Sequence, residues 1–241
     1  MAIGSISHAY ALTTLPASNG SFAISQSKVY YLKGSFNDWS ANNEYIFNDV
    51  TSTMIPEENK INEYSISKTL SKGATLKVWD SDNNWYTQGV DNCSYDDKWG
   101  RSTDNNADYV VPMTATYSIY LKFYSTGATQ VYLTAPDFET IYLKPNSNWL
   151  SDNARFAAYF FNNSGNEWHD LIPDGDYYGI TIPEGYNKVI FCRMSSSATD
   201  NNWSNVWNQT EDLHFDKTSY LNALEIPDDS WTASNSDWGS K

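Results

Sequence analysis

The sequence contains few of the residues that build disulfides, metal centres and basic surfaces. Its two cysteines, Cys93 and Cys192, fall in different halves of the chain, so we predict no disulfide between them. The three histidines, His8, His169 and His214, are scattered and have no metal-ligand spacing with the cysteines. Lys and Arg number 15 against 29 Asp and Glu, which gives a net charge of −14. Because this charge repels polyanions, we expect no nucleic-acid partner.

Long apolar runs are also absent. No window of about 20 apolar residues occurs, which predicts no membrane insertion. The N-terminal stretch MAIGSISHAYALTTLPASNG lacks a charged start and an unbroken apolar segment, so it does not resemble an intact signal peptide. We interpret residues 1–21 as a leader or linker, because Ser, Ala, Thr, Pro16 and Gly20 dominate them.

Aromatic residues, by contrast, are abundant. The chain has 10 Trp and 18 Tyr, whereas charged residues make up only 18%. Amphipathic aromatics at this density suit surfaces that stack on flat, half-polar ligands such as sugars. The alternative is a Tyr-rich β-sandwich core, which would absorb about half of them.

Short strand candidates recur at regular spacing between Asn, Asp, Ser and Gly clusters, as in all-β sandwiches. The first set is Lys28–Lys33, Tyr64–Leu70, Thr75–Trp79, Asp108–Pro112, Tyr117–Tyr124 and Thr129–Leu133. The second set is Thr140–Lys144, Arg155–Phe161, Glu167–Leu171, Tyr177–Ile182, Lys188–Arg193 and Tyr220–Glu225. Pro136 ends a strand between the sets, so we predict one module over residues 22–136 and another over 137–241.

A short internal repeat supports two related modules. The motif YLK is followed by GSFNDW, ending at Trp39, and again by PNSNW, ending at Trp149. Each module is therefore expected to open with a strand and a loop that carries Asn and Trp.

The segment Arg155–Leu171 is the first candidate site. Alternate residues of a strand share a face, which gives Arg155–Phe161 an apolar core row and a second row containing Tyr159 and Phe161. We predict that the second row faces solvent and that its aromatic planes stack on a sugar ring. A buried hairpin is the alternative.

The turn that follows decides whether Trp168 joins Tyr159. A symmetric loop over Asn162–Asn166 pairs Phe161 with Glu167, which turns Trp168 toward the core row. A bulge or a different loop length places Trp168 beside Tyr159 instead. The sequence leaves both registers open.

The polar stretch Asn201–Thr210 is the second candidate. It carries Trp203 and Trp207 among several side-chain amides and hydroxyls, a composition that suits sugar recognition. In the alternative interpretation, both Trp residues cap the core and the Asn side chains satisfy turns.

The order of these motifs resembles carbohydrate-binding module family 26, a starch-binding family. The resemblance covers about residues 139–241 and is carried by Tyr142–Trp149, Ala157–Phe161, Trp168, Val189–Phe191 and Gln209–Leu213. It implies binding of starch and malto-oligosaccharides. By position, the family's binding residues correspond to Tyr159, Trp168 and Gln209. Ala157 stands where the family has a stacking aromatic, and either Trp203 or Trp207 could replace it.

Residues 25–136 more loosely resemble the immunoglobulin-like modules that accompany pullulanases and other starch enzymes. The resemblance is carried by Tyr31–Trp39, Lys77–Trp79 and Asn84–Tyr86. Together, the two resemblances imply an all-β fold of two tandem antiparallel β-sandwich modules of the immunoglobulin-like type. Trp85 and Tyr86, in the polar run DSDNNWYTQG, form a candidate second site.

The same run holds a calcium candidate. Asp80, Asp82 and Asn84 alternate as at the front of a calcium loop, but Trp85 replaces Gly at the sixth position and Asp91 replaces Glu at the twelfth. Oxygen-rich turns are usually solvated turns, so we expect no cofactor, with calcium as the alternative.

We expect a non-catalytic binding protein. A glycosidase needs two carboxylates that face each other across a cleft, and most Asp and Glu here lie in predicted turns. A small β-sandwich glycoside hydrolase and a spacer module without sugar binding are the alternatives. The resemblance implies a secreted or cell-surface location, as a monomer within a larger bacterial starch-degrading protein or complex such as an amylosome.

Overall fold

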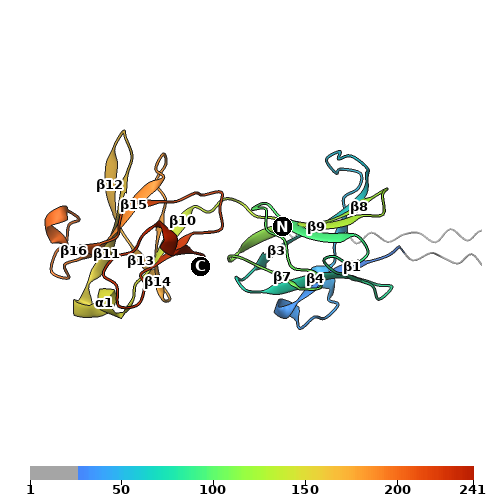
Figure 1. Ribbon diagram of the computed structural model, residues 1–241, viewed down its shortest axis with the longest axis horizontal. Helices are drawn as coiled ribbons and strands as arrows, with labels where there is room; N and C mark the ends of the chain where they lie inside the picture. Colours follow the sequence, from blue (N-terminus) through green and yellow to red (C-terminus); the bar gives the residue numbers. More distant parts are fainter. Residues whose placement is uncertain (1–26) are drawn as a thin grey trace, which may run out of the picture.

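The computed structural model describes residues 27–241 and shows an all-β protein with a few short helical turns. The segment interpreted as a leader, residues 1–21, lies outside the described residues. The strands form four sheets, two in each half of the chain (Figure 1). Among the described residues, no helix has the length and apolar character needed to cross a membrane.

The N-terminal half, residues 27–136, contains two sheets. The first has the order β1 (Tyr30–Gly34), β4 (Thr75–Asp80) and β5 (Trp85–Tyr86), with β7 (Tyr109–Val110) also paired to β4. The second has the order β2 (Asn48–Asp49), β3 (Lys60–Leu70), β8 (Ala115–Tyr124), β9 (Thr129–Thr134) and β6 (Cys93–Asp97). Strand β6, which is not among the predicted strands, runs parallel to β9.

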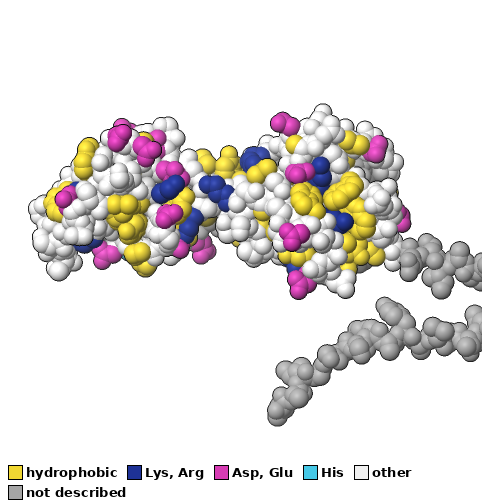
Figure 2. All heavy atoms as spheres, turned by 90° about the horizontal axis from the view of Figure 1, so that it is seen from below, with side chains coloured by type: hydrophobic (Ala, Val, Ile, Leu, Met, Phe, Trp, Pro, Cys, Tyr) yellow, Lys and Arg dark blue, Asp and Glu magenta, His cyan; other side chains and the backbone are white. Residues whose placement is uncertain are grey.

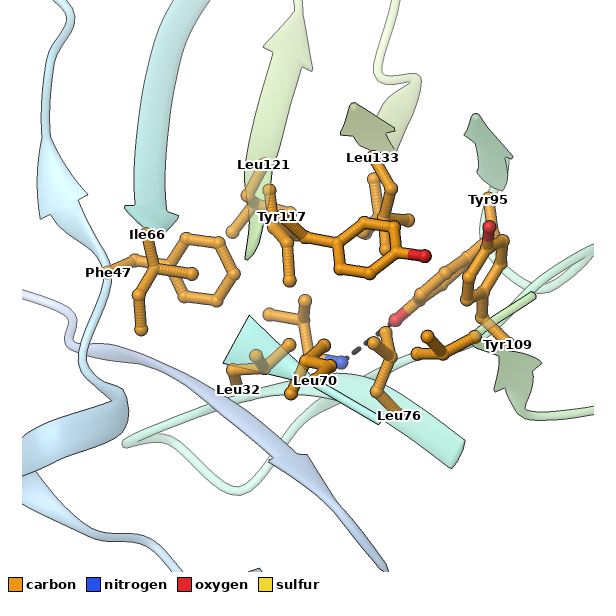
Figure 3. Close-up of a cluster of buried hydrophobic side chains, with 14 of the residues drawn as sticks. Leu32, Phe47, Ile66, Leu70, Leu76, Tyr95, Tyr109, Tyr117, Leu121 and Leu133 are labelled. Carbon is orange, nitrogen blue, oxygen red and sulfur yellow. Dashed lines mark hydrogen bonds between the residues drawn. The ribbon is translucent and has the colours of Figure 1, made fainter. Parts of the chain in front are cut away.

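Both sheets contribute side chains to one buried cluster. It contains Leu32, Leu76 and Val78 from the first sheet, and several Tyr residues lie among the leucines (Figure 3). The Tyr95 hydroxyl accepts a hydrogen bond from the Val78 N–H at 2.8 Å and donates one to the Tyr86 carbonyl at 2.8 Å. A buried Tyr is stable only when its hydroxyl is paired in this way. The core therefore absorbs part of the aromatic content, as the alternative interpretation expects.

The C-terminal half, residues 137–241, also contains two sheets. One has the order β13 (Ile172–Asp174), β14 (Tyr177–Thr181), β10 (Thr140–Lys144), β18 (Ala223–Glu225) and β19 (Trp238–Gly239). The other has the order β12 (Asn166–Asp170), β11 (Arg155–Phe161), β15 (Lys188–Met194) and β16 (Val206–Gln209), with β17 (Leu213–His214) also paired to β15. Strands β10 and β11 have the bounds predicted from the sequence, whereas β13 and β16 are not among the predicted strands.

A second buried cluster fills the space between these sheets. Phe156, Ala158 and Phe160 of β11 point into it, so the predicted core row of this strand is correct. The short helix α1 (Ser147–Leu150) adds the fully buried Trp149, and the Asn146 side chain caps the helix by accepting from the Trp149 N–H at 3.0 Å. Both cysteines are buried free thiols.

The two halves contact each other through polar and aromatic side chains. The Trp99 indole N–H donates to the Thr218 carbonyl at 2.8 Å, and its ring meets that of Tyr220 with a centroid separation of 5.6 Å. The Arg101 guanidinium also lies over the Tyr220 ring, 5.1 Å from its centroid. Cations over aromatic faces and edge-to-face rings are both attractive arrangements. These contacts supplement the covalent connection between the halves.

We expect Phe160→Ala to lower the free energy of unfolding by about 3–5 kcal/mol, because Phe160 is fully buried between two sheets. Ile172→Ala is the control, since the Ile172 side chain is 67% exposed and should change the value by less than about 0.5 kcal/mol. Urea unfolding followed by circular dichroism measures both. Equal losses in the two variants would contradict the placement of β11.

Candidate functional site

The hairpin between β11 and β12 places Trp168 on the same face as Tyr159. Tyr159 pairs directly with Trp168, and Phe161 pairs with Asn166. The Asn162 side chain sets this register, because its oxygen accepts hydrogen bonds from the N–H groups of Ser164 and Gly165 at 2.7 and 2.9 Å. The loop is therefore one residue shorter than the symmetric loop considered above, and Trp168 turns away from the core.

Three aromatic side chains from two separate segments meet on this face. The centroids of Tyr159 and Trp168 are 4.8 Å apart, and Trp203 lies 4.8 Å from each of them. Phe161 extends the group by stacking on Tyr159 at 5.8 Å with an interplanar angle of 20°. We call these four residues the aromatic platform. Its members are half-buried, apart from Trp203, which is 45% exposed.

Ala157 adds no aromatic ring to the platform, whereas Trp203 supplies one from a separate segment. Ala157 lies on the platform face of β11 and is fully buried, together with Cys192 and Met194 of β15. Burial raises the pKa of the Cys192 thiol to about 12, so this thiol stays protonated beneath the platform. The segment 195–205, which carries Trp203 in a short helical turn (Trp203–Asn205), follows β15 directly.

Arg155 fastens this segment to the hairpin. Its guanidinium donates hydrogen bonds to the carbonyls of Ala198 and Asp200 at 2.8 and 2.6 Å, and to the Asp170 carboxylate at 3.0 Å. It also donates to the side-chain oxygen of Asn201, whose amide in turn donates to Asp170 at 3.0 Å. A planar guanidinium presents several donors in fixed directions, which makes it suited to joining three chain segments. Arg155 therefore positions Trp203 over the sheet.

Gln209 lies on the platform face at the other edge of the sheet. It pairs with Cys192, which in turn pairs with Ala157 of β11. Its side chain is exposed, so its amide is available to solvent and ligand. An amide has both donor and acceptor atoms and suits the hydroxyls of a sugar.

Trp207, the other candidate to replace the missing aromatic, has no ring contact with the aromatic platform. A bulge in the pairing of β15 and β16 leaves Trp207 without a cross-strand partner. Its ring instead lies over the Arg193 guanidinium, 4.8 Å from the centroid, and Trp231 lies over the same group at 5.5 Å. Arg193 is 3% exposed and donates to the Trp149 carbonyl at 2.9 Å. Sequence analysis gave no signal for Trp231.

In the N-terminal half, Trp85 and Tyr86 point to opposite sides of β5. Trp85 pairs with Trp79 of β4 and is 44% exposed. Tyr86 packs against the core and donates a hydrogen bond from its hydroxyl to Asp80 at 3.1 Å. Tyr86 is therefore half-buried and hydrogen-bonded to Asp80, and Trp85 presents the more exposed ring of the two. Trp39 lies 6.1 Å from Trp85 between ring centroids, a neighbour that the sequence did not associate with it.

The calcium candidate is a hydrogen-bonded turn. The Asp80 carboxylate accepts from the N–H groups of Asp82 and Asn84 at 3.0 and 2.9 Å, and Lys28 lies 3.0 Å from it. Burial by itself raises the pKa of Asp80, but the hydrogen bonds from Asn84 and Lys28 outweigh burial and lower the pKa below its ordinary value. Among residues 27–241, no group of three or more His, Cys, Asp or Glu is arranged to hold a metal.

A surface hollow of about 610 Å³ lies elsewhere, beside β3, β8 and β9 of the N-terminal half. Its lining includes Met54, Ile55, Tyr120 and Tyr132, and no predicted site residue belongs to it. The aromatic platform is an open surface, which suits an extended ligand better than a small enclosed one.

Comparisons of this chain with family models, curated proteins and solved structures found no match.

We expect Arg155→Leu to loosen segment 195–205, because the variant removes the hydrogen bonds that hold it. Amide hydrogen exchange should become faster in this segment and stay unchanged in the core strands. Arg101→Leu, in the N-terminal half, is the matched control and should leave segment 195–205 protected. Unchanged exchange in Arg155→Leu would contradict the fastening role.

Proposed function

We propose that this chain is a non-catalytic carbohydrate-binding protein whose aromatic platform binds starch and malto-oligosaccharides. The observation that carries the proposal is the meeting of Tyr159, Trp168 and Trp203 on one solvent-facing surface. Aromatic rings that lie partly exposed outside the core offer apolar faces to the C–H groups of sugar rings. The exposed amide of Gln209 provides hydrogen bonds for hydroxyl groups at the ring edge.

The choice of α-glucan rests on the resemblance to carbohydrate-binding module family 26. Tyr159, Trp168 and Gln209 occupy positions that correspond to binding residues of that family, and all three lie on one face of the sheet. The departure at Ala157 is offset by Trp203, which supplies a third ring from a different segment. The three rings meet at interplanar angles of 51° to 67°, so they offer a ligand differently oriented faces and edges.

Two carboxylates beside the hairpin and segment 195–205 are engaged in hydrogen bonds, which supports binding without catalysis. Asp170 accepts hydrogen bonds from Arg155 and Asn201, and Asp200 accepts from Asn205 at 3.1 Å. Both carboxylates therefore hold segment 195–205 in place. Glycoside hydrolysis requires a pair of carboxyl groups free to reach the scissile bond.

We further propose that each half is an immunoglobulin-like β-sandwich module, with a boundary near residue 136. Two sheets around one buried cluster in each half support this organisation. The net charge of −14 favours a neutral partner over nucleic acid or an anionic membrane. A secreted or cell-surface location, as a monomeric part of a larger starch-degrading system, follows from the resemblance alone.

Trp203→Ala tests the site. A stacked aromatic contributes about 1–2 kcal/mol, so we expect affinity for amylopectin to fall about tenfold or more. Trp207→Ala is the matched control, because Trp207 has nearly the same exposure, 43% against 45%, but contacts Arg193. Affinity electrophoresis on amylopectin, pullulan, cellulose and xylan measures both variants. Equal losses of amylopectin affinity in the two variants would contradict the proposal. Retardation of the wild-type protein by cellulose but not by amylopectin would contradict it as well.

We expect incubation with maltoheptaose to release no reducing sugar, because the carboxylates near the platform are held in hydrogen bonds. A reducing-end assay over several hours, with an active amylase as the positive control, measures the outcome. Sustained turnover that is lost in Asp170→Asn would favour the alternative of a small glycoside hydrolase.

A further inference from the structure

A second group of aromatic side chains covers the outer face of the sheet formed by β1, β4 and β5. Tyr31 of β1 pairs with Trp79 of β4, and Trp79 pairs with Trp85 of β5, so the three side chains form one row across the strands. The centroids of Tyr31 and Trp79 are 5.6 Å apart. The residues that alternate with this row, such as Leu32 and Val78, are fully buried on the opposite face.

Trp39 joins the row from the loop that follows β1. Its ring lies 6.1 Å from Trp85 at an interplanar angle of 62°. Asp38 and Trp39 both have positive φ, at 51° and 58°, which is uncommon for bulky residues and costs free energy. The Asn37 side chain stabilises this loop by accepting from the Gly34 N–H at 2.9 Å and donating to the Leu32 carbonyl at 3.1 Å.

Lys33 lies within this aromatic group. Its ammonium nitrogen is 3.7 Å from the Trp79 ring centroid and 5.1 Å from that of Trp85, and the residue is only 8% exposed. Among the residues that the structure describes, no carboxylate or carbonyl accepts a hydrogen bond from it. Lys77, its cross-strand partner, is instead paired with Asp108 at 2.9 Å. The Lys33 ammonium has three N–H donors, and none of them has a hydrogen-bond acceptor among the described residues. These donors can therefore bond an incoming ligand.

The space-filling view from below shows hydrophobic side chains gathered on the N-terminal half, the half that carries β1 and β4 in Figure 1 (Figure 2). An exposed aromatic surface of this kind with a polar group at its centre is typical of a binding site.

We propose that Tyr31, Trp39, Trp79 and Trp85, together with Lys33, form a second carbohydrate-binding platform. The rings stack on sugar faces, and the Lys33 ammonium donates hydrogen bonds to hydroxyl or ring oxygens. The ligand is a neutral polysaccharide, since a net charge of −14 disfavours an acidic one. That this polymer is an α-glucan, as for the first platform, rests on the proposed function.

Two weak platforms on one chain act together on a polymer. Once one platform holds a glucan, the other meets the same chain at a high local concentration, which raises the overall affinity without any new contact. A short oligosaccharide that reaches only one platform gains nothing from the other. The second platform therefore converts a weak sugar contact into polymer adhesion.

Indole N–H signals in two-dimensional NMR spectra test the two platforms separately. The chain has 10 Trp, and single Trp→Phe variants assign their signals. On titration with maltoheptaose, we expect the signals of Trp39, Trp79 and Trp85 to shift in the wild type and equally in Trp203→Ala. Shifts confined to Trp168 and Trp203 would overturn the second platform and leave the proposed function standing. Shifts confined to Trp39, Trp79 and Trp85 would support the second platform and contradict binding at the first.

Affinity electrophoresis completes the test. On amylopectin, we expect Trp85→Ala and Trp203→Ala each to reduce retardation and the double variant to abolish it. Lys33→Met should weaken the N-terminal platform several-fold, whereas Lys77→Met is the control and should not. Circular dichroism checks that each variant is folded. Wild-type retardation by a folded Trp85→Ala variant, or preferential retardation of the wild type by polygalacturonate, would overturn the proposal.

Discussion

The hydrogen bonds of a single guanidinium decide the shape of the C-terminal aromatic platform. Arg155 begins β11, and its donors reach carbonyls of segment 195–205 and the Asp170 carboxylate at the end of β12. A strand, a hairpin end and a long connection are thereby held at one point. Trp203 contacts Tyr159 and Trp168 only because this connection is held against the sheet. Arg155 is half-buried, and its charge interacts with the neighbouring chain segments more than with solvent.

Much of the C-terminal site was predictable because strand periodicity is a local property. The bounds of β11, its buried row and the outward position of Tyr159 all follow from alternation within Arg155–Phe161. The pairing of Trp168 was not predictable, because one residue more or fewer in the turn reverses its side. The Asn162 side chain settles it by closing the turn early. Trp203 and Trp207 were indistinguishable in sequence. The bulge that leaves Trp207 without a cross-strand partner depends on pairing with β15, which the sequence does not reveal.

The N-terminal platform was hidden for a different reason. Tyr31, Trp79 and Trp85 belong to three strands, two of them far apart in sequence, and meet only through cross-strand pairing. Residue propensity and hydrophobic alternation predict each strand separately, but they do not predict which strands pair with each other. Strand β6 was not predictable for a related reason, since its partner β9 is parallel to it and supplies no hairpin signal. Tyr86 lies on the core side of β5, because adjacent residues of a strand face opposite sides and Trp85 faces outward.

The contact between the halves has a mechanical consequence. Trp99 and Arg101 of the N-terminal half contact Tyr220 and the Thr218 carbonyl of the C-terminal half. The covalent connection near residue 136 is therefore not the only link between the halves. Two halves linked by noncovalent contacts as well as by the chain bend and twist less relative to each other than two halves linked by the chain alone. If both platforms bind glucan, these contacts restrict how far the two platforms can move relative to each other. A restricted separation favours glucans that can reach both platforms at once.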